Sequence, residues 1–469
     1  MTTMNGHDES KTKVLLFPWL GHGHLSPFLE LAKKLSNTNL LDVYLCSTRA
    51  NLDSVIKCRP PSVRLIELNL PALPELPSHL HTTNGLPVHL MPSLKQAFDM
   101  SIPLFSEILV NLKPDLLIYD IIQPWAPVAA GNLGIPSIVF ITTSVAASVF
   151  DLHLKYNKGV AFPYSALYYR AGEYVEPAKD CKDAKRVTDC LELSSSLMLV
   201  KSFKEIEGKY SDYLSVVTSK KIVPVGPLVA DPCPLDTKQN SVIQWLDEKA
   251  VGSTVFVSFG SEYFLSSLDL EEIAYGLELS NVNFIWVLRF PKGETNIKIS
   301  KVLPLGYLER VKERGLIVEG WAPQAHILKH KNIGGFVSHC GWNSVLEAMK
   351  FGVPIIAMPM HLDQPINTRL VAEVGVGVEV VRDENRRLNR EKVADVVQHV
   401  VMSKSGGPVR EKAKQMSVDL SLKGNEEIDV VVEELLQLCK SGGSRDGRGN
   451  RKELQSNGFA NGKHYASKD

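Results

Sequence analysis

The feature of this sequence that most restricts its fold is a regular alternation of short apolar runs with helical patterns. VLLFPWL (14–20) is typical of a buried strand, and FLELAKKLS (28–36) carries apolar residues at helical spacing. The alternation continues through DVYLCST, VRLIELN, DLLIYD and SIVFITT, and it resumes from TVFVSFGS onward. Strands that alternate with helices predict an α/β fold of the doubly wound type, with parallel sheets covered by helices.

The length of the chain indicates two such domains. Its 469 residues are about three times a typical domain, and prolines cluster without periodicity in IVPVGPLVADPCPLD. EEIDVVVEELLQLC predicts a last helix, and the polar, Gly- and Ser-rich residues after it are expected to be disordered. We therefore expect an N-terminal Rossmann-like domain over 1–225, a linker over 226–240, a C-terminal Rossmann-like domain over 241–425, a last helix over 426–440 that packs back on the N-terminal domain, and a disordered tail over 441–469.

Charge and apolar content exclude several classes of partner. Lys and Arg balance Asp and Glu at 52 each, which argues against nucleic acid or an anionic membrane as partner. No apolar run reaches spanning length, and the first dozen residues lack the apolar core of a signal peptide. Seven widely spaced cysteines without a CxxC pair indicate reduced thiols. We expect a cytoplasmic protein.

A strand–turn–helix segment, GGFVSHCGWNSVLEAMKFG, is the first candidate for a binding site. The small residues Gly341, Asn343 and Ser344 would let backbone N–H groups meet a phosphate at a helix N-terminus, with His339 at the strand end. A capping box from Ser344 to Glu347 explains the same pattern equally well. The sequence has neither GxGxxG nor GxxxxGK[ST], which excludes the standard dinucleotide and P-loop motifs.

Other predicted strand ends carry residues suited to a nucleotide and a sugar. SFGSEYF opens into a loop at Ser261, and Trp321 in GWAPQ could stack on a flat base or lie in the core. Asp363 and Gln364 precede Pro365, which is typical of a first helical position. A carboxylate and a carboxamide together suit vicinal hydroxyls, although a helix cap is the alternative.

The loop GHGHLSP places two histidines after the first predicted strand. Ser26 and Pro27 indicate a helix cap and a first-turn proline, so His24 would lie close to the positive end of a helix dipole, which disfavours a charged imidazole. Asp120 ends the predicted strand DLLIYD and would orient a histidine, or cap a turn. Periodicity alone does not choose between His22 and His24.

One continuous stretch carries a family resemblance. WAPQAHILKHKNIGGFVSHCGWNSVLEAMKFGVPIIAMPMHLDQ (321–364) closely resembles the plant secondary-product glycosyltransferase box, with W-A-P-Q, H-C-G-W-N-S and D-Q at the expected spacing. The chain thus resembles plant family 1 UDP-sugar-dependent glycosyltransferases over all but the tail after about residue 440. The resemblance implies the GT-B fold, in which two Rossmann-like doubly wound domains face each other across a cleft.

The resemblance also implies roles for individual residues. G-H-G-H-L-S-P aligns His24 with the catalytic base and Asp120 with its partner, while His22 falls on a variable position expected to line the acceptor site. On the donor side, Trp321 would stack on uracil beside Ala322, Gln324 and Glu347 would bind the ribose, Ser261, His339, Asn343 and Ser344 would hold the diphosphate, and Thr142, Trp342, Asp363 and Gln364 would contact the donor sugar.

The implied reaction is an inverting transfer. His24 removes a proton from an acceptor hydroxyl, whose oxygen attacks the anomeric carbon as UDP leaves. The sequence contains no D-x-D motif, so neither a metal nor any cofactor beyond the UDP-sugar is implied. The final Gln of the box usually accompanies UDP-glucose.

The acceptor is expected to be a glycoside. FPWLGHGHLSPFLELAKKLS and LPELPSHLHTTNGLPVHLMPSLKQAF resemble the subgroup that adds sugar to sugar on flavonoid, lignan or triterpenoid glycosides. Direct transfer to an aglycone hydroxyl is the alternative within the class, and a phosphorylase, an epimerase or a UDP-sugar-binding protein without activity are the alternatives outside it. We expect a monomer.

Overall fold

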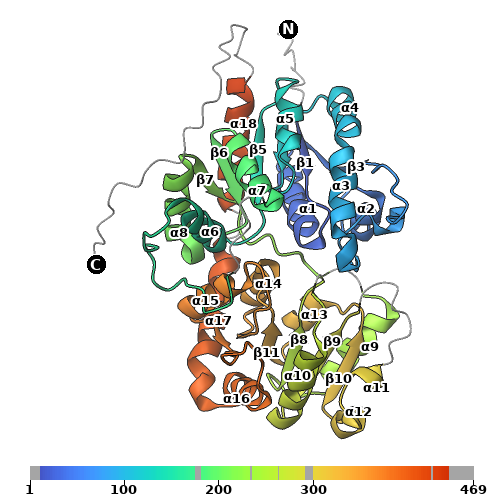
Figure 1. The fold of residues 1–469 in the computed structure, drawn as a ribbon, viewed down its shortest axis with the longest axis vertical. Helices are drawn as coiled ribbons and strands as arrows, with labels where there is room; N and C mark the ends of the chain where they lie inside the picture. The colour runs from blue at the N-terminus through green and yellow to red at the C-terminus, as the bar shows by residue number, and fades with distance from the viewer. Residues whose placement is uncertain are drawn as a thin grey trace, which may run out of the picture.

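The chain folds into two α/β units, each built on a parallel sheet (Figure 1). The computed structural model describes residues 11–174, 181–232, 235–261, 263–290, 299–423 and 426–442. The strand order is β3-β2-β1-β4-β5-β6-β7 in the first sheet and β10-β9-β8-β11-β12-β13 in the second. Both orders reverse beside the first strand of their sheet, as in doubly wound folds, so the predicted fold class is confirmed.

The first unit contains the elements from β1 to α8. Its strands are β1 (Thr12–Phe17), β2 (Leu41–Ser47), β3 (Val63–Glu67), β4 (Leu116–Tyr119), β5 (Ser137–Ile141), β6 (Leu197–Val200) and β7 (Lys221–Pro224). Its α-helices are α1 (His22–Ser36), α2 (Arg49–Val55), α3 (Met91–Met100), α4 (Ile102–Leu112), α5 (Trp125–Gly131), α6 (Val145–Tyr156), α7 (Lys182–Leu193) and α8 (Lys204–Thr218).

The second unit contains the elements from α9 to α17. Its strands are β8 (Thr254–Ser258), β9 (Asn283–Leu288), β10 (Gly315–Glu319), β11 (Ile333–Ser338), β12 (Ile355–Ala357) and β13 (Gly377–Glu379). Its α-helices are α9 (Thr237–Asp247), α10 (Ser267–Ser280), α11 (Ile299–Val302), α12 (Tyr307–Val311), α13 (Gln324–Lys329), α14 (Trp342–Phe351), α15 (Gln364–Val374), α16 (Arg390–Val401) and α17 (Gly407–Lys423). Three short 3-10 helices, Ser78–Leu80, Val88–Leu90 and Lys404–Gly406, complete the description.

The first sheet is buried on both faces. Val14 and Leu16 of β1 belong to one apolar core, and Leu15 and Phe17 belong to another on the opposite face. Successive side chains of a strand point to opposite faces, which explains why the run VLLF is continuously apolar. The carboxyl ends of the strands are therefore the edge at which this unit can present polar groups to a ligand.

A last helix, α18 (Glu426–Gly442), returns the chain to the first unit (Figure 1). Its apolar residues Val431 and Leu435 are fully buried in the same core as Leu16 and Phe28. The tail was expected over 441–469, but residues 441 and 442 belong to α18, and 443–469 lie outside the described residues. Over the described ranges, no helix combines the length and the apolar character needed to cross a bilayer.

The N-terminus of α1 differs from the prediction. The helix begins at His22 with Gly21 as N-cap, one turn before the expected cap at Ser26. The N–H groups of His24 and Leu25 donate to the Gly21 carbonyl at 3.0 and 2.8 Å, which starts the helix there. Pro27 consequently lies inside the helix.

Some short elements were not predicted. β6 has four residues and β13 has three, and neither run was recognised as a strand. β7 includes the start of the proline cluster, and α9 begins at Thr237, inside the expected linker. Five described cysteines are free, namely Cys46, Cys181, Cys190, Cys340 and Cys439, but Cys58 is disulfide-bonded, so the prediction that all seven are reduced is wrong.

Candidate active site

A cavity of about 280 Å³ lies between the two units and is lined by residues of both. It collects the residues that the sequence singled out at strand ends far apart in the chain. The predicted site residues that line it are His24, Thr142, Ser261, Trp321, Ala322, Gln324, His339, Trp342, Asn343, Ser344, Glu347, Asp363 and Gln364. Of the predicted set, only Asp120 stands back from the wall, directly behind His24.

His24 and Asp120 form a close pair on the first unit. His24 Nδ1 lies 2.9 Å from Oδ2 of Asp120, whose side chain is fully buried. The same Oδ2 accepts from the N–H of Trp19 at 3.1 Å, and Oδ1 accepts from the N–H of Ile121 at 2.7 Å. Because a carboxylate only accepts, His24 donates from Nδ1, and its Nε2 carries the lone pair of a base.

Thr142 and Trp321 contact the two histidines of the GHGHLSP loop. The Thr142 hydroxyl lies 3.0 Å from His24 Nδ1, so Thr142 contacts the predicted base as well as lining the cavity. His22 packs edge-on against Trp321, with ring centroids 5.4 Å apart. His22 also lines the cavity, as expected, while its contact with an acceptor stays a prediction.

The turn from β11 into α14 has the form of an anion site. Gly341 is the N-cap of α14, so Ser344 is the third helical residue and cannot form the alternative capping box with Glu347. The Glu347 carboxylate instead accepts from Gln324 Nε2 at 2.5 Å. The first N–H groups of a helix have no acceptor within the helix. In α14 this N-terminal end lines the cavity.

His339 is packed tightly beside this turn. A Cβ at Gly260 or at Gly341 would lie 2.7 or 2.5 Å from its Nε2, so only glycine fits at either position. Burial lowers the pKa of His339 to about 4, which keeps its imidazole neutral. Its Nδ1 is buried and has no hydrogen-bond partner among the described residues.

The predicted uracil platform is accessible. Trp321 is 48 % exposed, and the guanidinium of Arg289 lies 4.6 Å from its ring centroid. Arg289 also lines the cavity and was missed in the sequence, because it lies beyond β9 without a motif around it. The Ala322 carbonyl next to this tryptophan accepts from the Gln324 N–H at 2.8 Å.

Asp363 and Gln364 lie at the start of α15, and hydrogen bonds orient their side chains. Asp363 is the N-cap of α15 but makes no capping bond with its side chain, which excludes the cap alternative. Its Oδ2 accepts from Asn367 Nδ2 at 2.9 Å, and Asn367 Oδ1 accepts from the Ser144 hydroxyl at 2.5 Å. Gln364 Oε1 accepts from the backbone N–H groups of Met360 and His361. These two bonds fix the carboxamide, so its NH₂ group is the end that could donate to a ligand.

A lysine that the sequence did not reveal completes the junction. Lys201, just after β6, is buried, and its Nζ donates to Oδ1 of Asn343. Asn343 Nδ2 in turn donates to the Gly23 carbonyl at 2.7 Å. The indole N–H of Trp342 donates to the Lys201 carbonyl at 2.7 Å. The side chains of Asn343 and Trp342 thus bind the first unit, and a diphosphate would meet Asn343 through its backbone N–H.

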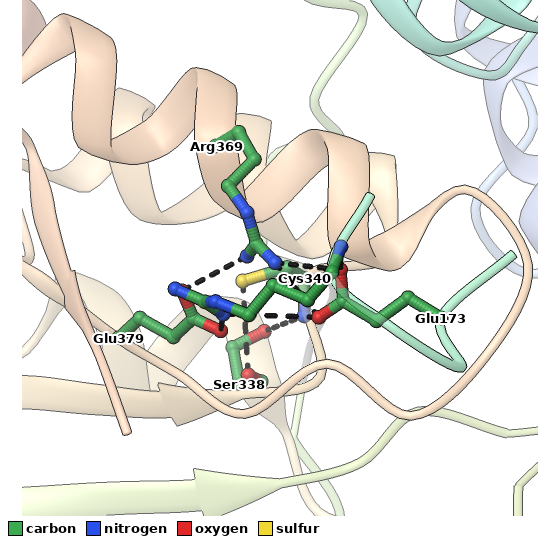
Figure 2. A network of polar contacts seen from close by, with 6 residues as sticks. Glu173, Ser338, Cys340, Arg369 and Glu379 are labelled. Carbon is green, nitrogen blue, oxygen red and sulfur yellow. Dashed lines mark hydrogen bonds and ion pairs between the residues drawn. The ribbon is translucent and has the colours of Figure 1, made fainter. Parts of the chain in front are cut away.

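A ring of four charges also joins the units (Figure 2). Arg369 of α15 donates to Glu173 at 2.7 Å and to Glu379 at 2.9 Å, and Arg170 pairs with Glu379 and, at 3.7 Å, with Glu173. Figure 2 shows the ring beside the turn that leads from β11 to α14. Among the residues that the structure describes, no three His, Cys, Asp or Glu side chains are grouped to hold a metal ion.

Two facing doubly wound units with a shared polar cavity define the GT-B class of glycosyltransferases, and comparison with known proteins agrees. A glycosyltransferase N-terminal domain model matches residues 10–230, and the model described as "UDP-glucoronosyl and UDP-glucosyl transferase" matches residues 221–412. UDP-glucosyltransferase 29 of Panax ginseng is 51% identical over 94% of this chain and 99% of its own length. The chain belongs to the plant family 1 UDP-glycosyltransferases.

Further relatives and solved structures extend this result. Mogroside IIIx synthase of Siraitia grosvenorii is 52% identical over 92% of this chain and 98% of its own. Beta-D-glucosyl crocetin beta-1,6-glucosyltransferase of Gardenia jasminoides is 47% identical over 90% and 98%. A Glycyrrhiza uralensis glycosyltransferase solved with glycyrrhetinic acid 3-O-monoglucuronide has a TM-score of 0.79 at 25% identity, over 92% of this chain and 97% of its own.

A second solved structure was determined with a donor analogue. It is a Phytolacca americana glycosyltransferase complexed with UDP-2fluoro-glucose and pterostilbene. Its TM-score is 0.75 at 27% identity, and the match covers 92% of this chain and all of that one.

Proposed function

We propose that this enzyme transfers glucose from UDP-glucose to a hydroxyl of a sugar already attached to a plant natural product, with inversion at the anomeric carbon. The observation that carries the proposal is the His24–Asp120 pair, which opens on the same cavity as the N-terminus of α14. The relative from Gardenia jasminoides acts, by its name, on a glucoside and forms a sugar–sugar bond. That relationship favours a glycoside acceptor, such as a flavonoid, lignan or triterpenoid glycoside.

The first unit would supply the base. His24 Nε2 takes the proton of the acceptor hydroxyl as the oxygen attacks the anomeric carbon. Asp120, held by its two backbone donors, keeps the imidazole in the Nδ1–H tautomer and stabilises the imidazolium that forms. The Thr142 hydroxyl beside Nδ1 would limit rotation of the ring and border the donor sugar.

The second unit would hold the donor. Trp321, which is about half exposed, would stack on uracil beside Ala322. Gln324 and Glu347, which are hydrogen-bonded to each other, would bind the hydroxyls of the ribose. Developing negative charge on the leaving UDP would meet the N–H groups at the start of α14, together with Ser261, Ser344 and a neutral, donating His339. Asp363 and Gln364 would grip the hydroxyls of the sugar with acceptor and donor groups respectively.

The test is a donor panel crossed with an acceptor panel. UDP-glucose, UDP-xylose, UDP-galactose and UDP-glucuronate would each be offered with a flavonoid or triterpenoid glucoside and with its aglycone. We expect fastest turnover with UDP-glucose and a glucoside, and an NMR spectrum showing a β linkage from the α-linked donor. Faster turnover of the aglycone would replace the proposal by its alternative, direct aglycone glucosylation.

The base is tested separately. We expect His24→Ala to lower kcat by about 10²–10⁴-fold, the usual contribution of general base catalysis, with UDP affinity retained in calorimetry. His22→Ala is the matched control, and it should keep kcat and raise the KM for UDP-glucose because its ring supports Trp321. Wild-type turnover in His24→Ala would remove the histidine from this role.

We also propose that the enzyme acts as a cytoplasmic monomer without any cofactor besides its donor. One chain supplies every residue named for the cavity, which supports a monomer. Light scattering of the purified protein and the location of a fluorescent fusion in plant cells would test these points.

A further inference from the structure

Lys201 is a buried cation at the junction of the two units. It is 2 % exposed, lines the cavity and donates from Nζ to Asn343 Oδ1. Burying a charged group is costly unless polar partners surround it. None of the roles proposed for the base pair or for the donor site involves Lys201.

The contact fixes the orientation of the Asn343 carboxamide. A carboxamide has one accepting end and one donating end, and a lysine Nζ paired with it takes the accepting end. Oδ1 therefore turns toward Lys201, and Nδ2 turns toward the Gly23 carbonyl, 2.7 Å away. If the amide rotated by half a turn, its NH₂ group would face the Lys201 ammonium and its oxygen would face a carbonyl, both repulsive.

The Gly23 carbonyl is available because of a proline. In a helix this carbonyl would accept from the N–H four residues later, but that residue is Pro27, which has no N–H. Asn343 fills the vacant place from the other unit. Gly23 directly precedes His24, and Asn343 is the second residue of α14, so this single contact joins the predicted base to the predicted diphosphate site.

We propose that Lys201 is a positioning residue of the transfer reaction, which holds the Asn343 carboxamide so that the turn carrying His24 stays at a fixed distance from the N-terminus of α14. This inference rests on the proposed function, because it takes His24 as the base. Burial lowers the pKa of Lys201 to about 7, against the opposing carboxylates of Glu347 and Glu30. Both the ammonium and the amine can donate to Oδ1, so the contact survives on either side of that pH.

The experiment is a double-mutant cycle on Lys201→Met and Asn343→Ala. Methionine keeps an apolar stem of similar length but removes the donor. Lys201→Met should lower kcat by about 10–100-fold, as expected when reacting groups are misplaced by about 1 Å. The KM for UDP-glucose, and the affinity for UDP alone in calorimetry, should stay within about threefold of the wild type, because the donor unit is intact.

A matched control tests whether any lysine at the junction has this effect. Lys209 in α8 also crosses to the second unit, where it pairs with Glu373, but it does not line the cavity. Lys209→Met should leave kcat within about twofold of the wild type, as is usual for a partly exposed ion pair. A loss of kcat equal to that of Lys201→Met would mean that contact between the units matters in general, and would overturn the proposal.

The cycle decides how Lys201 acts. If it works through Asn343, adding Lys201→Met to Asn343→Ala should lower kcat no further. An equal fold loss in both backgrounds would overturn the inference, and so would a tenfold loss of UDP affinity with kcat unchanged, which is the behaviour of a direct phosphate ligand. Failure of the proposed function differs, because it would appear as retained turnover in His24→Ala.

Discussion

At the scale of single residues, Asp120 is the most constrained group in the site. Its two oxygens accept from three donors, namely His24 Nδ1 and the N–H groups of Trp19 and Ile121. None of these donors can be exchanged for an acceptor without moving the backbone or changing the tautomer of the histidine. The geometry therefore requires a carboxylate at this position, and the role proposed for His24 depends on it.

Replacing Asp120 by Asn tests this constraint. Whichever oxygen becomes NH₂, it faces a donor, so one buried hydrogen bond turns into a repulsive contact. We expect Asp120→Asn to lower the free energy of unfolding by about 1–3 kcal/mol, the cost of a buried unsatisfied group. We also expect kcat to fall by about 10²–10⁴-fold, because the imidazole loses its orienting acceptor. Urea denaturation and initial rates measure the two effects.

A carboxylate on another strand of the same sheet serves as the control. Asp42 in β2 lies 3.8 Å from Arg64, and its side chain is 30 % exposed. Asp42→Asn should change the unfolding free energy by less than about 1 kcal/mol and leave kcat unchanged. Normal kcat in Asp120→Asn would show that His24 does not need this acceptor.

At the scale of elements, the turn between β11 and α14 depends on glycine. A Cβ at Gly341 would lie 2.5 Å from Nε2 of His339, and the neighbouring Cys340 already has a φ of 63°. Such left-handed backbone at a non-glycine residue is strained and is typical of functional turns. The His339 ring also approaches Gly260 closely, because a Cβ at that position would lie 2.7 Å from its Nε2.

Gly341→Ala should therefore damage the predicted diphosphate site. We expect UDP affinity to fall at least tenfold in calorimetry, and the unfolding free energy to fall by about 1–3 kcal/mol from overpacking. Gly131→Ala in α5 is the control, since nothing lies within 4 Å of its added Cβ, and it should be neutral or slightly stabilising. Unchanged UDP affinity in Gly341→Ala would separate this turn from the donor site.

The site residues that could be predicted from the sequence are those that follow a recognised strand. The apolar runs of β1, β4 and β11 were recognised as strands, and the polar residues that follow them led to His24, Asp120 and His339. β6 is as short as β4 but was not recognised as a strand, so Lys201 just after it was given no role.

The start of α1 was misplaced because Pro27 resembles a first-turn proline. Pro27 instead lies inside the helix, where it has no N–H to donate to the Gly23 carbonyl, and Asn343 of the other unit donates to that carbonyl. No local sequence pattern encodes this contact.

At the scale of the whole molecule, the chain crosses between its two units twice. It leaves the first unit after β7 and returns to it with α18, whose Leu435 is fully buried in the core beneath β1 and α1. Helix α1, which carries the proposed base His24, therefore packs against the last helix of the chain, far from it in sequence. The stability of the predicted catalytic unit should depend on this late segment.

Leu435→Ala measures that dependence. Removing the buried side chain leaves a cavity, and we expect a loss of about 2–5 kcal/mol in the free energy of unfolding. Leu422→Ala in α17 is the control, because that leucine is 75 % exposed and should be close to neutral. If α18 packed independently of the first unit, the two substitutions would give similar denaturation midpoints.

The ring of Arg170, Glu173, Arg369 and Glu379 is a charged link between the units (Figure 2). Arg369 is 3 % exposed and holds one carboxylate from each unit, so Arg369→Met leaves two nearly buried carboxylates with only Arg170 between them. We expect a loss of about 3–5 kcal/mol, as when one member of a buried ion pair is removed. Arg49→Met should cost less than about 1 kcal/mol, because Arg49 and its partner Asp53 are well exposed. Equal costs in urea denaturation would mean that water already screens the ring, so that its ion pairs add little to the stability of the junction.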